Sequence, residues 1–175
     1  NKAMKMACGK YLIFLNAGDR FYSSDTLKKI FENHSDADAI YGQTMIVDAQ
    51  YRELGLRRLK APAELSWKSL INGMLVCHQS FIIKRELAPV YDLNYSISSD
   101  YDWMITCLKR SEKIVNSGMI IAEFVDGGLN KKRMVTGLIE RFAVMVKNYG
   151  LVRTVLVHLF FPFRFAAFYL MHRRV

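Results

Sequence analysis

Three short stretches of the chain place polar side chains directly after apolar segments. They are LNAGD (residues 15–19), CHQS (residues 77–80) and SSDYDW (residues 98–103). Carboxylates in such stretches can bind a divalent cation or accept a proton, and imidazole and amide groups can bind phosphate or a sugar hydroxyl. Open α/β sheets bind their ligands at the carboxyl ends of their strands, so these three stretches are candidate site residues.

Each stretch also has a purely structural interpretation. Asn, Gly and Asp are turn formers, so Asp19 can be a turn residue. His78 and Gln79 can be polar residues satisfied at the edge of a strand. Asp100 can simply favour the positive end of a helix, where a carboxylate is worth ~0.3–1 kcal/mol. A functional interpretation therefore depends on the three stretches acting together.

The elements that would position these residues follow from the apolar pattern. Helices are expected over 1–8, 23–34, 61–73, 98–111 and, with breaks at Gly150 and Pro162, 131–171. Strands are expected over 10–15, 78–87 and 119–128, and residues 38–54 are expected to form two strands with a hairpin near Asp48. Ser98 or Ser99 is expected to cap the helix that carries Asp100. Alternating strands and helices favour an α/β fold with a mostly parallel sheet and one antiparallel insertion.

Composition narrows the class of protein. With 175 residues, of which 51% are hydrophobic, the chain has the length of one domain and enough apolar residues to exclude extended disorder. The three cysteines (Cys8, Cys77 and Cys107) are widely spaced and form no CxxC pair. This spacing argues against a disulfide framework or a zinc site and indicates a reducing compartment.

The order of the motifs resembles one enzyme family. NKAMKMACGKYLIFLNAGD, then CHQSFIIKREL with YDLNYSISSDYDWMI, and finally FVDGGLN are similar to consecutive motifs of family 2 inverting glycosyltransferases of the GT-A fold. The resemblance covers about residues 1–130 and is closest to the non-processive enzymes that build bacterial surface polysaccharides. It implies a GT-A-like (Rossmann-like) mixed sheet flanked by helices, followed by a helical extension over 131–175. The family's first, nucleotide-binding strands would precede Asn1, so this stretch alone is expected to bind nucleotide poorly and to be inactive if nothing precedes it.

The resemblance also implies a donor site. In the family a nucleotide diphosphate sugar is the donor, and a divalent metal ion (magnesium or manganese) is held by aspartates after the FL strand. Asp19 matches the last of these aspartates and is the expected metal ligand. Asn16 and Gly18 match donor-binding positions where acids are usual, which predicts a weaker site. Lys131 and Arg133 follow the glycine pair and are expected to neutralise the leaving diphosphate; a plain solvated charge run is the equal alternative.

Inversion requires a base that takes the proton from the acceptor hydroxyl. Asp100 matches the family's catalytic aspartate, and partial burial would raise its pKa toward a useful value. Asp102 lies two residues further along and would point away from it on a helix. His78 and Gln79 match the family's HQ pair, which is expected near the diphosphate or the acceptor.

The charge of the chain is uneven. The formal net charge is +9, and from residue 131 onward nine Lys and Arg residues face a single acid, Glu140. Residues 150–175 combine this charge with a block of aromatic and aliphatic residues. Because the aromatics cluster and do not alternate with Lys and Arg, an anionic membrane surface is favoured over nucleic acid. A helix packed on the catalytic domain is the alternative for this tail.

Together these observations predict a metal-dependent glycosyltransferase that moves a sugar with inversion to a glycan or polyprenol-linked acceptor, in cell-surface polysaccharide synthesis. Residues 1–130 would belong to the catalytic domain and residues 131–175 would form the basic, apolar tail. The protein would be cytoplasmic and peripheral to the inner face of the cell membrane. The rival hypothesis is a non-catalytic or truncated basic module at the membrane periphery.

Overall fold

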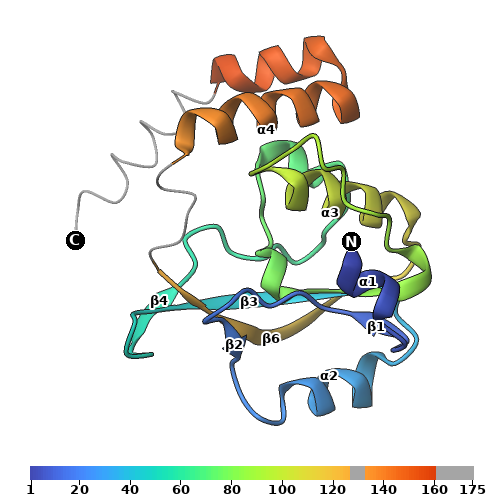
Figure 1. Ribbon diagram of the computed structural model, residues 1–175, viewed down its shortest axis with the longest axis vertical. Coiled ribbons are helices and arrows are strands. Elements are labelled where there is room, and N and C mark those ends of the chain that lie inside the picture. The colour runs from blue at the N-terminus through green and yellow to red at the C-terminus, as the bar shows by residue number, and fades with distance from the viewer. Residues whose placement is uncertain (127–132, 161–175) are drawn as a thin grey trace.

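The computed structural model describes residues 1–126 and 133–160 (Figure 1). Its centre is a six-stranded mixed sheet in the order β1-β5-β3-β6-β2, with β4 paired to β3. The strands are β1 (Tyr11–Leu12), β2 (Arg20–Phe21), β3 (Ala39–Val47), β4 (Glu53–Leu56), β5 (Phe81–Lys84) and β6 (Ile114–Val125). The mixed α/β sheet flanked by helices that the resemblance implies is thereby confirmed.

Helices lie on both faces of this sheet. They are α1 (Lys2–Met6), α2 (Thr26–His34), α3 (Ser99–Arg110) and α4 (Met134–Tyr149), and residues 151–160 form a further helical segment after Gly150. In Figure 1, α2 lies against one face of the sheet and α3 against the other, while α4 and residues 151–160 form an outer layer above α3. Gly150 ends α4 with φ +84°, a conformation that favours glycine.

The predicted predominance of parallel strands is wrong for the strands that the structure describes. β3 and β6 pair in parallel, whereas β1–β5, β3–β5, β3–β4 and β2–β6 are antiparallel. Part of the reason is local, because the chain returns from β3 to β4 through the predicted hairpin. The Asp48 carboxylate closes this hairpin by accepting from the N–H groups of Gln50 and Arg52, both at 2.9 Å.

Several elements are shorter than the pattern predicts. Only Tyr11–Leu12 of the segment 10–15 and Phe81–Lys84 of the segment 78–87 form strand, and residues 61–73 form only a 3₁₀ turn over Ser69–Asn72. Conversely, β3 runs unbroken through Gly42. A Cβ at Gly42 would lie 2.4 Å from the carbonyl oxygen of Met119, so this glycine lets β3 and β6 approach closely.

Two apolar clusters hold the helices to the sheet. Ile30, Ile40, Ile82 and Ile121 pack between the sheet and α2. A larger cluster between the sheet and α3 is built on aromatic and aliphatic side chains, among them Tyr41, Phe81, Tyr101, Trp103 and Met104. Burial of these large side chains fixes α3 on the sheet, so that the first turn of α3 has a defined position.

Helix α4 is tied to α3 by packing and by polar contacts. Val144 and Met145 are buried. Lys147 Nζ and Asn148 Nδ2 donate to the Asp102 carboxylate at 2.9 and 3.1 Å. In the described part of the chain, no helix has the length and hydropathy needed to cross a membrane.

Candidate active site

The LNAGD stretch forms a tight turn between β1 and β2. The Asp19 N–H donates to the carbonyl oxygen of Asn16 at 3.0 Å, and Gly18 has φ +93°. The Asp19 carboxylate accepts from the N–H of Val125, the last residue of β6, at 3.1 Å and from Gln79 Nε2 at 2.7 Å. The turn therefore brings the first candidate stretch to the second at the carboxyl end of β6.

The CHQS stretch is a 3₁₀ turn, His78–Ser80, that leads into β5. Gln79 is buried, and its Oε1 accepts from Cys77 Sγ at 2.8 Å. The Ser80 hydroxyl donates to the carbonyl oxygen of Gln43 at 3.0 Å and lies 2.7 Å from the Thr44 hydroxyl. These bonds orient the Gln79 amide so that its nitrogen faces Asp19.

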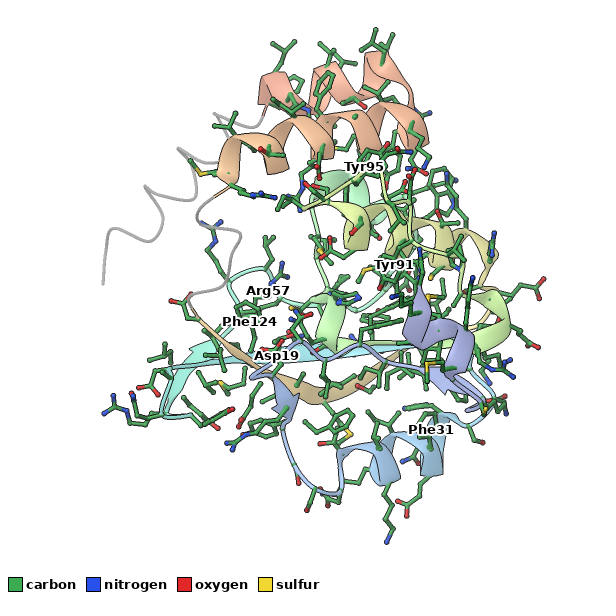
Figure 2. The ribbon with its side chains drawn as sticks, viewed as in Figure 1. Asp19, Phe31, Arg57, Tyr91, Tyr95 and Phe124 are labelled. Carbon is green, nitrogen blue, oxygen red and sulfur yellow. The ribbon has the colours of Figure 1, made fainter. Side chains whose placement is uncertain are left out.

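His78 sits in an aromatic box. Its ring lies 5.5 Å from that of Phe14 and 5.9 Å from that of Trp103, and Nε2 is 2.7 Å from the Tyr91 hydroxyl. Burial lowers the pKa of His78, an effect that the nearby Asp100 and Asp19 charges partly oppose. The imidazole is thus neutral at pH 7, with Tyr91 as its fixed partner (Figure 2 labels Tyr91).

Asp100 lies in the first turn of α3, as predicted. Its Oδ1 accepts from the N–H of Tyr101 at 2.8 Å. Within residues 1–126 and 133–160, no Lys or Arg side chain forms an ion pair with it. Burial raises the pKa of the Asp100 carboxyl, and the charges of His78 and Arg141 only partly offset this. A shielded carboxylate that forms no ion pair with a described Lys or Arg is suited to accepting a proton.

The neighbouring Asp102 differs from Asp100 in its direction and in its partners. It points to α4 and not to the sheet end, as its helical spacing predicts, and it is held by Lys147 and Asn148. Its side chain is 7% exposed, and that of Lys147 is 49% exposed. Asp102 is therefore a structural carboxylate that joins α3 to α4.

Sequence reasoning missed a further carboxylate, Glu140 of α4. It accepts from the N–H groups of Ser96, Ile97 and Ser98 at 2.9, 2.7 and 2.9 Å, and from the Ser96 hydroxyl at 2.8 Å. These bonds lower the pKa of Glu140 to about 2 despite some desolvation. The available signal was that Glu140 is the single acid after residue 130. Its partners, some 40 residues away, carry no pattern that points to it.

The predicted cap on α3 is formed differently. Ser98 occupies the N-cap position, but its hydroxyl makes no bond to the helix. The hydroxyl donates instead to the carbonyl oxygen of Gly137 at 3.2 Å. The loop before Asp100 is thus positioned by α4.

Two cavities meet at Asp100. One of about 210 Å³ is walled by Asn16, His78, Gln79 and Asp100 together with Arg57, Phe124 and three further side chains. The other, of about 320 Å³, lies between α3 and α4 and is lined by Asp100, Arg57, Arg133 and Arg141 together with Met134, Leu138 and others. Figure 2 shows Asp19, Arg57 and Phe124 around the same region, below α4. Arg57, at the end of β4, was not predicted from the sequence.

The structure therefore brings most of the predicted residues together. One cavity is lined by Asn16, His78, Gln79 and Asp100. Asp19 is hydrogen-bonded to Gln79, and Arg133 lines the second cavity. Gly18 contributes its backbone: its carbonyl oxygen accepts from the Tyr51 hydroxyl at 2.9 Å. Lys131 lies outside the described residues.

The described residues contain no group of three or more His, Cys, Asp or Glu side chains that would hold a metal ion alone. Asp19 nevertheless fits a magnesium-type site. From the described residues, each of its carboxylate oxygens accepts one hydrogen bond, which leaves a further lone pair for a metal ion. Mg²⁺ is commonly bound through one or two carboxylates plus substrate phosphates, and the exposed Asn16 could add an amide oxygen.

Comparison with known proteins identifies distant relatives of the chain. No protein-family model matches the chain. A PGL/p-HBAD biosynthesis glycosyltransferase of Mycobacterium tuberculosis is 24% identical over 182 residues, which cover 89% of this chain and 68% of that protein. A Mycobacterium bovis protein of the same description matches to the same extent. The chain is a distant homologue of glycosyltransferases.

The fold of the present chain is that of solved GT-A glycosyltransferase structures. The crystal structure of S. aureus TarS 1–349 matches with a TM-score of 0.57 and 12% identity, over 92% of this chain and 50% of that one. TarS 1–349 in complex with UDP matches with a TM-score of 0.51 and 13% identity, over 85% and 44%. The present chain thus spans about half the length of the TarS 1–349 chain. At this identity the match establishes the fold.

Proposed function

We propose that this chain belongs to an inverting glycosyltransferase that takes a sugar from a nucleotide diphosphate donor. The observation that carries the proposal is Asp100, a shielded carboxylate of raised pKa that lacks a cation partner in the described chain and is shared by two cavities. The relatives are named as glycosyltransferases, and TarS, which shares the fold, was solved with UDP. These names support the donor class.

Each residue of the site has a proposed role in the transfer. Asp100 takes the proton from the acceptor hydroxyl as that oxygen attacks the anomeric carbon, on the face opposite the leaving diphosphate. The amide groups of Asn16 and Gln79 and the neutral imidazole of His78 orient the donor in the smaller cavity. Arg57 and Arg133 stabilise the negative charge that grows on the diphosphate, and Lys131 is proposed from the sequence to assist them.

Asp19 is the proposed ligand of a divalent cation, magnesium or manganese, with Asn16 as a second oxygen donor. When bound, such a cation would neutralise the charge of the diphosphate leaving group. Gln79 and the Val125 N–H hold the Asp19 carboxylate in place for this role. With a single carboxylate in LNAGD, metal binding is expected to be weak without the donor.

The acceptor and the location are proposed from the C-terminal part of the chain. Residues 131–175 are proposed as a basic, apolar extension of the catalytic portion at 1–130. Residues 150–175 would place the protein at the anionic, cytoplasmic face of the membrane, where a polyprenol-linked acceptor or growing surface glycan is available; nucleic acid is not a proposed partner. Of this stretch the structure describes 150–160, where Leu151, Val152 and Leu159 are exposed.

One assay tests the transfer itself. Release of nucleoside diphosphate from a panel of nucleotide sugars would be measured with Mg²⁺ or Mn²⁺ and, separately, with EDTA, in the presence of lipid-linked and free glycan acceptors. Acceptor-dependent release that EDTA abolishes is expected. No release with any donor would favour the rival hypothesis, a non-catalytic or truncated membrane-peripheral module, which the single carboxylate in LNAGD also favours.

The membrane proposal has its own test. The protein would be floated with vesicles of neutral phosphatidylcholine or of phosphatidylcholine mixed with an anionic phospholipid. The unmodified protein is expected to float with the anionic vesicles, and a Val152→Asp, Leu156→Asp variant is expected to remain behind. Equal flotation of both proteins would remove this segment as the membrane contact.

A further inference from the structure

The outer helical layer exposes an unusual amount of apolar surface. Ten apolar side chains of α4 and the next helical segment are exposed, with exposed fractions from 39% for Val155 to 73% for Val152. We call these residues the apolar face: Met134, Val135, Leu138, Ile139, Leu151, Val152, Val155, Leu156, Leu159 and Phe160. In Figure 1 these two helices lie farthest from the sheet. A patch of this kind marks an interaction site more often than a plain solvated surface.

Within the apolar face lies a groove. It has a volume of about 360 Å³ and is lined by Leu138, Ile139, Phe142 and His158. Phe142 and His158 close its floor edge-to-face, with their ring centroids 5.1 Å apart. The volume and the mostly apolar lining of the groove suit a hydrocarbon chain.

The groove adjoins the site at Asp100. Leu138 lines both the groove and the larger cavity, and Met134, another member of the apolar face, also lines that cavity. An apolar track therefore leads from the outer surface of α4 to the proposed base. Gly137, one turn before Arg141, lets α4 pack closely on Ile97 beside the cavity: a Cβ there would lie 3.1 Å from Ile97 Cγ2.

The inner end of the track is cationic. The described lining of the larger cavity includes Arg57, Arg133 and Arg141 and a single carboxylate, that of Asp100. The Arg141 guanidinium lies 4.9 Å from the centre of the Tyr101 ring, which orients it. Three arginines against one acid create a site for an anionic group, for which the planar guanidinium is well suited.

We propose that the cavity and the groove form one binding site for an amphiphile with an anionic head and a hydrocarbon chain. The head, a phosphate or phosphodiester, lies against Arg141, next to the two arginines proposed for the donor diphosphate, and the chain passes Leu138 into the groove. This inference rests on the proposed glycosyltransferase function and narrows its acceptor to a glycan that is linked to a lipid through phosphate, with a sugar hydroxyl as the attacking group. A free glycan has no chain with which to fill the groove.

Octyl phosphate, used as a monomer below its micelle concentration, probes this site by isothermal titration calorimetry on the full chain. Inorganic phosphate supplies the head without the chain, and 1-octanol supplies the chain without the head. Octyl phosphate is expected to bind more tightly than either. Leu138→Asn is expected to weaken octyl phosphate binding by about tenfold, since contact with one leucine side chain accounts for a change of this size.

Val135→Asn is the matched control. Val135 is on the same helix and 67% exposed, against 61% for Leu138, but it lines neither cavity nor groove. Its substitution is expected to leave octyl phosphate binding unchanged. Equal losses in the two variants would indicate general adsorption to the apolar face and would overturn the proposal. So would octyl phosphate binding no tighter than inorganic phosphate, the result expected if a protein partner or residues 161–175 cover the groove.

Nucleoside diphosphate release separates this proposal from the one on which it rests. Octyl phosphate binding that depends on Leu138, without release from any nucleotide sugar, would support the amphiphile site and overturn the transferase function. Release that requires only a free glycan, with no octyl phosphate binding, would do the reverse. Asp100→Asn is expected to retain octyl phosphate binding, because it removes only a negative charge from the head site.

Discussion

The two ends of the central sheet carry carboxylates with different surroundings. At the start of β3, Asp38 accepts from Lys84 Nζ at 2.6 Å and from the N–H groups of Glu112 and Lys113 at 2.9 and 3.0 Å, and its pKa falls to about 2. At the opposite end, the described residues that donate to Asp19 are Val125, through its N–H, and Gln79, through its amide. The charge of Asp38 is therefore balanced without a ligand. The charge of Asp19 is not balanced by a Lys or Arg of the described chain, and a bound metal ion would balance it.

The same contrast applies to the two aspartates of α3. Asp102 has Lys147 and Asn148 as partners, while Asp100 stands at the junction of two cavities with no ion pair in the described chain. Carboxylates with fixed cations stabilise a fold, whereas those without them are available for chemistry. The following predictions test this division.

Removal of the proposed base should have the largest effect. Asp100→Asn is expected to lower acceptor-dependent nucleoside diphosphate release by about 10²–10⁴-fold, because general-base catalysis typically contributes that much. The melting temperature should change little, since no ion pair is lost. Asp102→Asn is the matched control and should behave in the opposite way: a lower melting temperature with the catalytic rate largely retained. Near-normal turnover by Asp100→Asn would remove Asp100 from the base role.

Asp19→Asn should come next. The amide keeps one oxygen for the Val125 N–H but loses the charge that attracts Mg²⁺ or Mn²⁺. The metal concentration needed for half-maximal activity is expected to rise by about 10- to 100-fold, comparable with or larger than the loss from outer-sphere changes at metal sites. Titration of activity with MnCl₂ measures this. An unchanged metal requirement would assign Asp19 to the structural class with Asp38.

Asp38→Asn should affect stability and not activity. The pair of Asp38 with Lys84 is mostly shielded, with side chains 17% and 19% exposed, and its loss should cost about 1–3 kcal/mol of unfolding free energy. Urea titration at pH 7 measures this cost.

The pH dependence of the Asp38 contribution has a definite sign. Because the folded pKa of Asp38, about 2, lies below the ordinary value of 3.8 for an aspartate, the contribution is fully present above about pH 4 and is lost as the pH falls through 2. The difference between the unmodified protein and Asp38→Asn should therefore shrink across this range. A difference that does not vary with pH would contradict the ion-pair explanation.

Glu140→Gln should have the smallest effect. One of the two carboxylate oxygens becomes an NH₂ group that faces N–H donors, either that of Ser96 or those of Ile97 and Ser98. The loop before Asp100 should loosen, with a loss of about 1–2 kcal/mol in stability and a modest loss of catalytic rate. Glu140→Asp keeps the charge and should recover part of both. An unaffected rate would show that α4 supports the fold without positioning Asp100.

The sequence predicted the parts of the site that lie within short motifs. LNAGD, CHQS and SSDYDW each place their polar residues directly beside an apolar segment, and the structure brings Asn16, His78, Gln79 and Asp100 to one cavity. Arg57 and Glu140 escaped notice because a short basic stretch after a hairpin and a single acid in a helix carry no pattern that is specific to a site. The position of Glu140 depends on contacts with residues more than 40 positions away, Ser96 and Ile97 among them.

The sequence alone made accessible the local order of the elements, the β3–β4 hairpin, the helix that carries Asp100 and the resemblance to GT-A glycosyltransferases. Periodicity, turn residues and motif order are local properties and can therefore be read without the fold. Tertiary structure decided which strands are antiparallel, which aspartate is paired, and where the apolar face of α4 meets the cavity at Asp100. Those features depend on which side chains burial brings together. Burial also determines the charge state of a carboxylate, since the removal of water raises its pKa and a neighbouring cation lowers it.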